Sequence, residues 1–200
     1  MGVDSNCRKG TVVMKRFVDI LISCILVLVL LPLLVLIILL IKFDSRGPIL
    51  FKQRRIGRDN TEFMMYKFRS MRADTPRDVP THLFHNPEDY VTRSGRVLRK
   101  TSLDELPQLL NILKGEMSFI GPRPALYNQE DLIELRTERG IHRLTPGVTG
   151  WAQVNGRDDV SIEEKVNLDE YYYKNRSLWM ELKIVLQTFS SVVSSKGIRM

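Results

Sequence analysis

Two adjacent carboxylates, Asp104 and Glu105, lie in the segment SLDELPQLLNILKG, where a helix is expected to start. Ser102 and Glu105 match the S-x-x-E capping box, and Gly115 gives this helix a stop. Pro107 lacks an N–H and belongs in a first turn, which moves the expected start closer to Asp104. Asp104 would then sit at the positive end of the helix dipole, ionised and able to act as a nucleophile, while Glu105 could hold a divalent cation. A well-capped core helix is the competing interpretation.

Basic residues before and after this pair could bind phosphate groups. Lys67 and Arg69 alternate in an expected strand and so share one face, where two cations can cradle a diphosphate. Arg123 lies between two prolines in the string GPRP, which restricts the backbone and pre-organises the guanidinium for an oxyanion. Arg157 ends the string TPGVTGWAQVNGR, in which turn signals surround a short strand. An exposed sheet face, a stiff loop and a plain hairpin are the competing interpretations.

An apolar segment from Ile20 to Ile41 carries no charge and is long enough for the roughly 20 residues that a membrane helix needs. The sequence after it lacks the cleavage site of a signal peptide, so the segment is expected to stay. Pro32 near its middle removes a hydrogen bond to the Leu28 carbonyl and predicts a bend. Both flanks are basic, which favours a helix that re-enters one leaflet, with an ordinary kinked span as the alternative. The flanking cations are Arg8, Lys9, Lys15 and Arg16 before the segment, and Lys42, Arg46, Lys52, Arg54, Arg55 and Arg58 after it.

The remaining chain, within a total of 200 residues, is long enough for one folded domain. The net charge of the whole sequence, +7, suits nucleic acid, an anionic membrane or phosphorylated substrates, and charge alone does not choose among them. The two cysteines, Cys7 and Cys24, give no disulfide framework and favour a reducing compartment.

Other segments of the domain leave alternatives open. A strand over 49–53 precedes the basic cluster of Arg54, Arg55 and Arg58, which either contacts lipid phosphates or is a solvated loop. Residues 73–92 predict a long surface loop. A helix over 178–193 either lies in the membrane interface or packs on the domain core. Asp169 before it could orient an active-site arginine.

The strings SLDELPQLLNILKGEMSFIGPRP and TPGVTGWAQVNGR are specific, and through them the chain closely resembles the bacterial monotopic phosphoglycosyl transferases, the polyprenyl-phosphate sugar-phosphate transferases. The resemblance extends from Met14 to the end. It implies an α+β, mainly helical fold: a re-entrant membrane helix broken at Pro32, then a small cytoplasmic catalytic domain with a minor β element and amphipathic interfacial helices. The implied division is an extension over 1–13, the membrane helix over 14–45 and the catalytic domain over 46–200.

The resemblance also implies a mechanism and its residues. An aspartate, here Asp104, attacks the β-phosphate of a UDP-sugar, UMP leaves, and the covalent phosphosugar passes to undecaprenyl phosphate. Glu105 matches the glutamate associated with Mg²⁺. The basic positions expected near substrate phosphates are Lys67, Arg69, Arg99, Arg123 and, as a weaker match, Arg157.

The implied setting is the cytoplasmic face of the bacterial inner membrane, in contact with phospholipid. There the enzyme would catalyse the first membrane step of capsule, O-antigen, exopolysaccharide or glycoprotein glycan assembly, before downstream glycosyltransferases. An N-acetylated amino sugar is the expected donor sugar, whereas the pathway and the oligomeric state stay open. Direct transfer in a ternary complex and a non-enzymatic basic membrane adaptor are the alternatives, and nucleic acid is not an expected partner.

Two positions depart from the family pattern. The family often has Ser-Pro at the helix break, whereas this chain has Leu31-Pro32, so the break geometry is left open. Residues 1–13 precede the usual start of the catalytic unit. A misassigned start codon is one hypothesis for them, which N-terminal analysis of the native protein would test.

Overall fold

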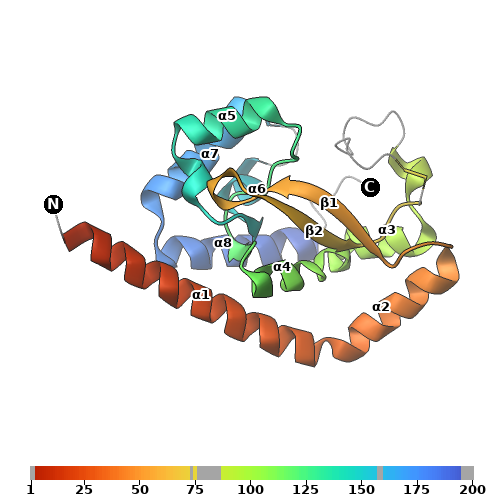
Figure 1. Ribbon diagram of the computed structural model, residues 1–200. Helices are drawn as coiled ribbons and strands as arrows, with labels where there is room; N and C mark the ends of the chain where they lie inside the picture. The colour runs from red at the N-terminus through yellow and green to blue at the C-terminus, as the bar shows by residue number, and fades with distance from the viewer. Residues whose placement is uncertain (1–2, 73, 76–86, 157–159, 195–200) are drawn as a thin grey trace.

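The structure is a computed structural model that describes residues 3–72, 74–75, 87–156 and 160–194. Two helices form a V below a body made by the rest of the chain (Figure 1). The fold is mainly helical with two small two-stranded sheets, which confirms the predicted fold class at this level.

The two arms of the V are α1 (Val3–Val29) and α2 (Leu31–Asp44), which meet at a bend of 65°. Pro32 lies in the first turn of α2, so the bend predicted at this proline is confirmed, with the break itself at Leu30. No single helix in the described ranges is long and apolar enough to cross a membrane, whereas Val13–Val29 and α2 pass that test together. α1 runs without interruption through residue 13, and the domain division at 13/14 stays a prediction.

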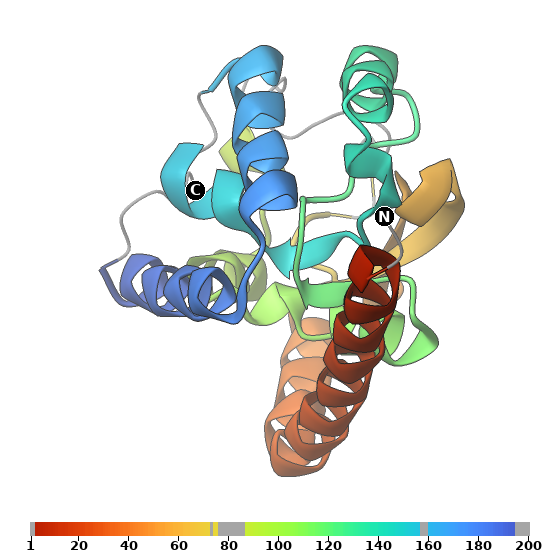
Figure 2. The same ribbon diagram turned by 90° about the vertical axis from the view of Figure 1, so that its left-hand side faces the viewer.

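Most of the apolar side chains on the V face outward. Ile37 and Ile41 of α2 are buried against Phe68 and Leu98 of the body. The exposed large apolar residues of the two arms include Phe17, Leu21, Ile25, Leu28, Val29, Leu31, Val35, Leu36, Leu39, Leu40 and Phe43. Figure 2 shows how far the V projects from the body.

Above α2 lies an antiparallel hairpin of β1 (Leu50–Ile56) and β2 (Glu62–Phe68), in which Leu50 pairs with Phe68. β1 extends beyond the predicted strand and contains Arg54 and Arg55, so the solvated-loop alternative is wrong for these two residues, and contact with lipid phosphates stays a prediction. The short 3₁₀ turn η1 (Arg58–Asn60) joins the strands.

The carboxylate pair lies in a 3₁₀ turn, η4 (Leu103–Glu105), and not in a capped α-helix. Ser102 adopts a left-handed conformation with φ of +55° and makes no side-chain capping bond, so the predicted capping box is wrong. The regular helix α4 (Gln108–Lys114) starts later, with Pro107 as its N-cap residue, and ends at Gly115 as predicted. The preceding elements are η3 (Pro87–Tyr90) and α3 (Arg93–Lys100).

The second sheet joins distant parts of the chain, because β3 (Ser118–Ile120) pairs in parallel with β4 (Gly147–Thr149). The predicted strand in the TPGVTGWAQVNGR segment is therefore present, but it forms no hairpin and leads into a helix. Glycine is required at Gly147 because a Cβ there would overlap the backbone of Gly121. The other elements are α5 (Glu130–Glu138), η5 (Ile141–Arg143), α6 (Trp151–Gly156), α7 (Ile162–Asn175) and α8 (Leu178–Ser194).

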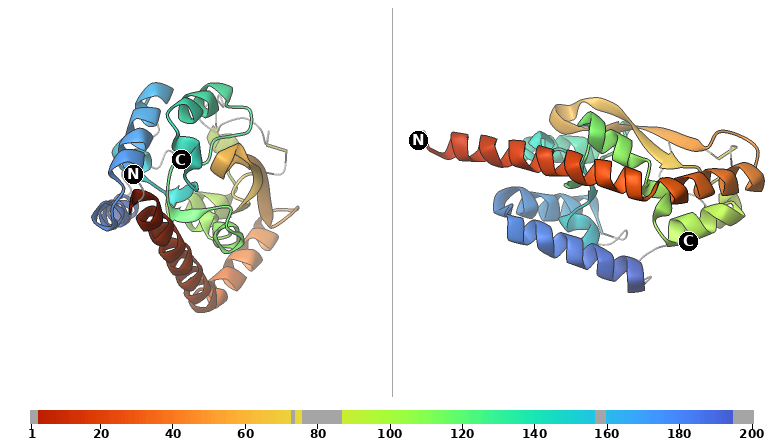
Figure 3. Two further views of the ribbon diagram at one scale, coloured as in Figure 1. Left: turned by 60° about the vertical axis from the view of Figure 1, so that its left-hand side comes forward. Right: turned by 90° about the horizontal axis from the view of Figure 1, so that it is seen from below.

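The predicted amphipathic helix is α8, seen with the V from below in Figure 3. Met180 and Ile184 are buried against Ile120 and Tyr172 of the body. The opposite side exposes Leu178, Trp179, Leu182, Leu186 and Phe189. α8 thus packs on the core with one face and leaves a second apolar face uncovered.

Two neighbouring cations fasten α1 to the body. The Lys15 ammonium donates to the Ile120 carbonyl at 2.9 Å and forms an ion pair with Glu181 at 2.6 Å. Arg16 donates to the carbonyls of Ile112 and Leu113 at the end of α4. These two members of the basic flank therefore contact the protein.

Candidate active site

Asp104 and Glu105 project from the η4 turn, directly after the strained backbone of Ser102. Asp104 is only 8% exposed, and the Glu105 side chain is 20% exposed. Two adjacent carboxylates so poorly hydrated require cationic neighbours.

Lys67 and Arg123 supply the positive charge. The Lys67 ammonium lies 2.7 Å from Glu105 Oε1, and two nitrogens of the Arg123 guanidinium lie 3.4 and 3.5 Å from the same oxygen. Burial opposes ionisation of Glu105, but Lys67 and Arg123 more than offset it and lower its pKa to about 2. Glu105 is therefore a fixed anion that holds two cations beside Asp104.

Asp104 has the opposite shift. Burial raises its pKa above the usual aspartate value, and Glu105 adds to the rise, while Lys67 and Arg99 oppose it. The prediction that a helix dipole keeps this carboxylate readily ionised is wrong, because α4 begins only at Gln108. Neighbouring carboxyls with separated pKa values are a recurrent property of catalytic pairs.

The position of Lys67 is set by the side-chain amide of Asn111 on α4, a residue that the sequence did not single out. The Tyr66 N–H donates to Asn111 Oδ1 at 3.0 Å, and Asn111 Nδ2 donates to the Met64 carbonyl at 2.7 Å. Asn111 is fully buried, and its side-chain amide hydrogen-bonds the backbone of β2 at the edge that does not pair with β1, as a neighbouring strand would. This contact fixes β2 against the helix that follows the carboxylates, and so places Lys67 beside Glu105.

Arg123 is located through its own backbone. Arg136 of α5 donates from Nη1 to the Arg123 carbonyl at 2.9 Å. Its Nε and Nη2 donate to Asp169 at 3.1 and 2.6 Å, in a buried ion pair. Asp169 therefore orients Arg136, which supports the turn that carries Arg123. Among the described residues, Arg136 forms no hydrogen bond with Asp104 or Glu105.

Arg55 was also missed as a site residue. It donates from Nη1 to the Pro124 carbonyl at 2.9 Å. Partial burial, followed by repulsion from Arg123, lowers its pKa to about 9, and Glu105 opposes the shift. Arg55 is thus a cation near both Arg123 and Glu105. The available signal was the alternation along β1. Gln53 and Arg55 share one face of the strand, and the exposed Lys52 and Arg54 share the other.

The other predicted cations divide into three cases. Arg99, in the last turn of α3, is close enough to lower the pKa of Asp104. Arg69 is not brought to Glu105 with Lys67: it is buried at the end of α2, where Nη2 donates to the Ile41 carbonyl and to Ser45. Arg157 lies outside the described residues.

The carboxylate pair fits the predicted Mg²⁺ in its donor chemistry. No group of three or more His, Cys, Asp or Glu side chains within the described segments could hold a metal ion by itself. Mg²⁺, however, is commonly held by one or two carboxylates together with the phosphates of a substrate. Asp104 and Glu105 offer these oxygens beside cations that suit a phosphate.

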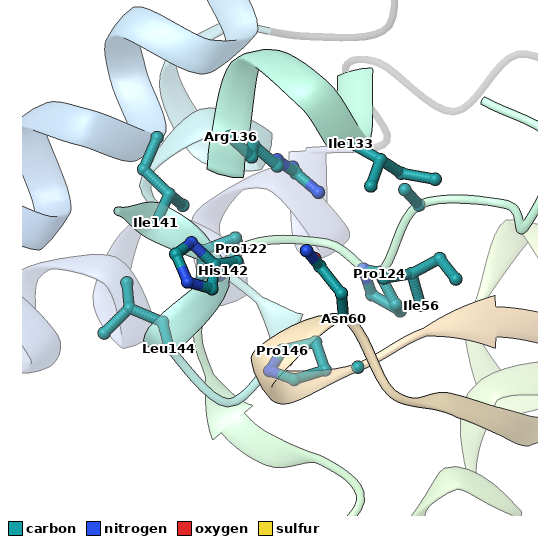
Figure 4. A pocket seen from close by; sticks show the side chains of 12 residues that line it. Ile56, Asn60, Pro122, Pro124, Ile133, Arg136, Ile141, His142, Leu144 and Pro146 are labelled. Carbon is teal, nitrogen blue, oxygen red and sulfur yellow. The ribbon is translucent and has the colours of Figure 1, made fainter. Parts of the chain in front are cut away.

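A small pocket lies behind the Arg123 turn (Figure 4). Pro122, Pro124, Arg136 and His142 are among its lining residues, and neither Asp104 nor Glu105 takes part. Its walls are largely proline and aliphatic, so it belongs to the support of the turn.

Comparisons with known proteins give the family of the chain. Residues 10–195 match the bacterial sugar transferase family. The chain is 42% identical to the undecaprenyl-phosphate glucose phosphotransferase of Komagataeibacter xylinus, over 92% of this chain and 36% of that protein. It is 40% identical to the uncharacterized sugar transferase EpsL of Bacillus subtilis (strain 168), over 94% of this chain and 91% of that protein.

A third relative, from Aeromonas hydrophila, is named UDP-N-acetylgalactosamine-undecaprenyl-phosphate N-acetylgalactosaminephosphotransferase. It is 39% identical, over 92% of this chain and 45% of that protein. The chain thus spans less than half of the Komagataeibacter and Aeromonas proteins and nearly all of the Bacillus protein. With the match over almost its whole length, this chain belongs to the bacterial sugar transferase family.

Proposed function

We propose that this chain transfers a sugar-1-phosphate from a UDP-sugar to undecaprenyl phosphate, with release of UMP. The observation that carries the proposal is the buried Asp104 beside Glu105, whose carboxylate holds Lys67 and Arg123 at the same place. A nucleophile and two cations within one small region suit attack on a diphosphate. The names of the Komagataeibacter and Aeromonas relatives support undecaprenyl phosphate as acceptor, and the Aeromonas name supports a UDP-linked donor.

The first half-reaction forms an aspartyl-phosphosugar. An oxygen of the Asp104 carboxylate attacks the β-phosphorus, the bond from this phosphorus to the bridging oxygen breaks, and UMP leaves with the electron pair. Lys67 and Arg123 offset the negative charge that develops on the phosphoryl oxygens. In the second half-reaction a phosphate oxygen of undecaprenyl phosphate attacks the same phosphorus, the bond from this phosphorus to the Asp104 oxygen breaks, and the Asp104 carboxylate leaves with the electron pair.

Mg²⁺ is the proposed cofactor, and carboxylate oxygens of Glu105 and of the neighbouring Asp104 would be its ligands from the protein. When bound, it would neutralise part of the diphosphate charge. The fixed ionisation of Glu105 supports this assignment, because only the ionised carboxylate is a strong ligand for a hard cation.

The membrane arrangement is also proposed. We infer that α1 and α2 dip into one leaflet of the bacterial inner membrane, with the body on the cytoplasmic face. The 65° bend, the outward apolar side chains and the rise of both arms toward the body support this (Figure 1). The uncovered apolar face of α8 would then lie against the phospholipid interface.

The donor sugar is proposed as an N-acetylated amino sugar. The name of the Aeromonas relative agrees with this class, whereas the Komagataeibacter relative is named for glucose. The product, a sugar on undecaprenyl diphosphate, would start a surface glycan such as a capsule, O-antigen, exopolysaccharide or protein-linked glycan. Downstream glycosyltransferases would extend it.

The test is intact mass spectrometry of the detergent-solubilised protein after incubation with a panel of UDP-sugars, with and without Mg²⁺ and without acceptor. We expect a mass increase of one sugar-phosphate on Asp104, with one sugar of the panel and only with Mg²⁺. Asp104→Asn should abolish both the adduct and turnover. Asp131→Asn, an isosteric change at an exposed position of α5, is the matched control and should leave both unchanged.

Two other results would replace this proposal. UMP release that needs undecaprenyl phosphate, without any adduct, would indicate direct transfer in a ternary complex. No UMP release from any sugar, with or without acceptor, would favour the membrane adaptor. Turnover by Asp104→Asn close to that of the wild type would contradict the role of Asp104.

A further inference from the structure

The segment that carries Arg123 has little means of holding itself in place. Residues 122–125 lie in no helix or strand, and Pro122 and Pro124 have no N–H to donate. The Arg123 side chain is 46% exposed, and its contacts to Glu105 are long. Something other than this ion pair must therefore fix the position of Arg123.

The carbonyls of this segment supply the missing restraint. Four consecutive carbonyls, from Pro122 to Ala125, each accept one hydrogen bond, and the donors lie on β4, α5 and β1. The donors are the Gly147 N–H at 3.0 Å, Arg136 Nη1 at 2.9 Å, Arg55 Nη1 at 2.9 Å and the Ile56 N–H at 2.9 Å, in chain order of their acceptors. Two of the four donors are thus guanidinium groups, which bind the consecutive carbonyls of Arg123 and Pro124.

Arg55 is itself held in one orientation. Its Nε and Nη2 donate to Gln53 Oε1 at 3.1 and 2.6 Å, and Gln53 is buried. Its backbone also forms an isolated β-bridge with Leu126, just beyond the turn. With its guanidinium fixed at both edges, Arg55 holds the Pro124 carbonyl at a set distance from β1.

We propose that Arg55 is a positioning residue for phosphosugar transfer: its bond to the Pro124 carbonyl holds the turn so that Arg123 faces Glu105 and the donor diphosphate. The inference rests on the proposed function. Without Arg55 the Pro124 carbonyl loses its partner and the turn gains freedom, so that Arg123 must be ordered each time a donor binds. Arg55 thus acts through Arg123, and its effect requires the Arg123 guanidinium.

The test is a double-mutant cycle of Arg55→Gln and Arg123→Ala, with the donor KM, kcat and the rate of adduct formation measured in each protein. Arg55→Gln should raise the donor KM about tenfold in the wild-type background, equivalent to about 1.4 kcal/mol. In the Arg123→Ala background the same substitution should change it less than about twofold. A purely structural role would affect both backgrounds alike.

Two further variants make the cycle decisive. Arg54→Gln is the matched control, because it removes the same charge from the next residue of β1, on the exposed side of the strand. The Arg54 Cζ atom lies 3.8 Å from the centroid of the Tyr127 ring. Its donor KM should stay within about twofold of wild type. Arg55→Lys keeps the charge but has no planar fork to contact both Gln53 and Pro124. It should raise the donor KM by a smaller factor, and it replaces Arg55→Gln in the cycle if that variant does not fold.

An equal rise in donor KM in both Arg123 backgrounds, or no rise in either, would overturn the proposal. Its failure is separable from failure of the proposed function. The latter is judged from wild-type adduct formation and from Asp104→Asn, neither of which depends on Arg55.

Discussion

The V of α1 and α2 and the turn around Asp104 have opposite relations to water. The helices expose large apolar side chains, such as Phe43 at 87%, while their own backbone hydrogen bonds hold their shape. The site removes charged groups such as Asp104 and Arg136 from water and depends on partners from β1, β2, α4, α5 and α7. The shape of the V is therefore a local property, whereas the geometry of the site is a property of the whole fold.

The two regions meet through the apolar side chains of α2, which pack near Leu103 and Leu106, and through Lys15 and Arg16 of α1. Arg16 holds the end of α4, whose other end follows the carboxylate turn. Lys15 holds the carbonyl of Ile120, directly before the segment that leads to Arg123. α1 is thus tied to both chain segments that supply the site.

The largest effect should come from the buried ion pair that supports the Arg123 turn. Asp169→Asn leaves the guanidinium of Arg136 buried without its counter-charge, and we expect a loss of about 3 kcal/mol in the free energy of unfolding. The displaced Arg136 should also lower kcat/KM at least tenfold through the Arg123 carbonyl. Denaturant unfolding in detergent and steady-state kinetics measure the two effects.

Glu170→Gln is the control, one residue along α7. Glu170 pairs with Arg139 and with Lys174 at the surface, where ion pairs contribute at most about 1 kcal/mol. Similar losses in both variants would show that burial of the Arg136–Asp169 pair does not set the stability of this region.

The contrast between local shape in the V and long-range contacts in the site also explains what the sequence could predict. The apolar run, the bend at Pro32, the stop at Gly115 and the amphipathic α8 follow from periodicity and backbone sterics, and each was confirmed. These features need no knowledge of distant residues. The membrane insertion of the V stays a prediction.

The errors concern the site. The capping box failed because the Glu105 carboxylate forms a long-range ion pair with Lys67 instead of bonding to its own turn. The raised pKa of Asp104 was not foreseen because its burial comes from tertiary packing. Asn111 had no local signal, since its role depends on β2 lying alongside α4.

A smaller effect tests the tie between the two regions. Lys15→Met removes the donor to Ile120 and one cation of Glu181, and we expect a loss of about 2 kcal/mol in unfolding free energy. The cost is limited because Glu181 keeps Arg176 and the Tyr172 hydroxyl as partners. Lys174→Met, at an exposed i,i+4 pair, should cost less than about 0.5 kcal/mol. Equal costs would mean that Lys15 behaves as a surface charge.

A change in pH profile, and not in stability, tests the carboxylate pair. Asp104 must be ionised to attack, so kcat/KM should fall as pH falls through its raised pKa. Lys67 lowers this pKa, so Lys67→Gln should move the acid limb to higher pH. Glu105 raises it, so Glu105→Gln should move the limb to lower pH. Shifts in the same direction would show that another group controls the limb.

The smallest effect on stability is expected on the uncovered face of α8, where Trp179 is 74% exposed and its neighbour Met180 is 7% exposed. Trp179→Gln should change the unfolding free energy in detergent by less than about 0.5 kcal/mol, because a side chain left in solvent loses little on replacement. Met180→Gln should cost about 2 kcal/mol or more, since it places an amide in the core.

The position of Trp179 relative to lipid can then be read directly. The chain has two tryptophans, so Trp151→Phe leaves Trp179 as the single tryptophan, which is excited selectively at the red edge of the aromatic absorption band. In nanodiscs, lipids brominated near the headgroup should quench its emission more than soluble iodide does, because an interfacial helix buries its apolar face only about 5–10 Å into the bilayer. Strong iodide quenching without bromolipid quenching would place α8 in water, and would restrict the membrane contact of this protein to the V.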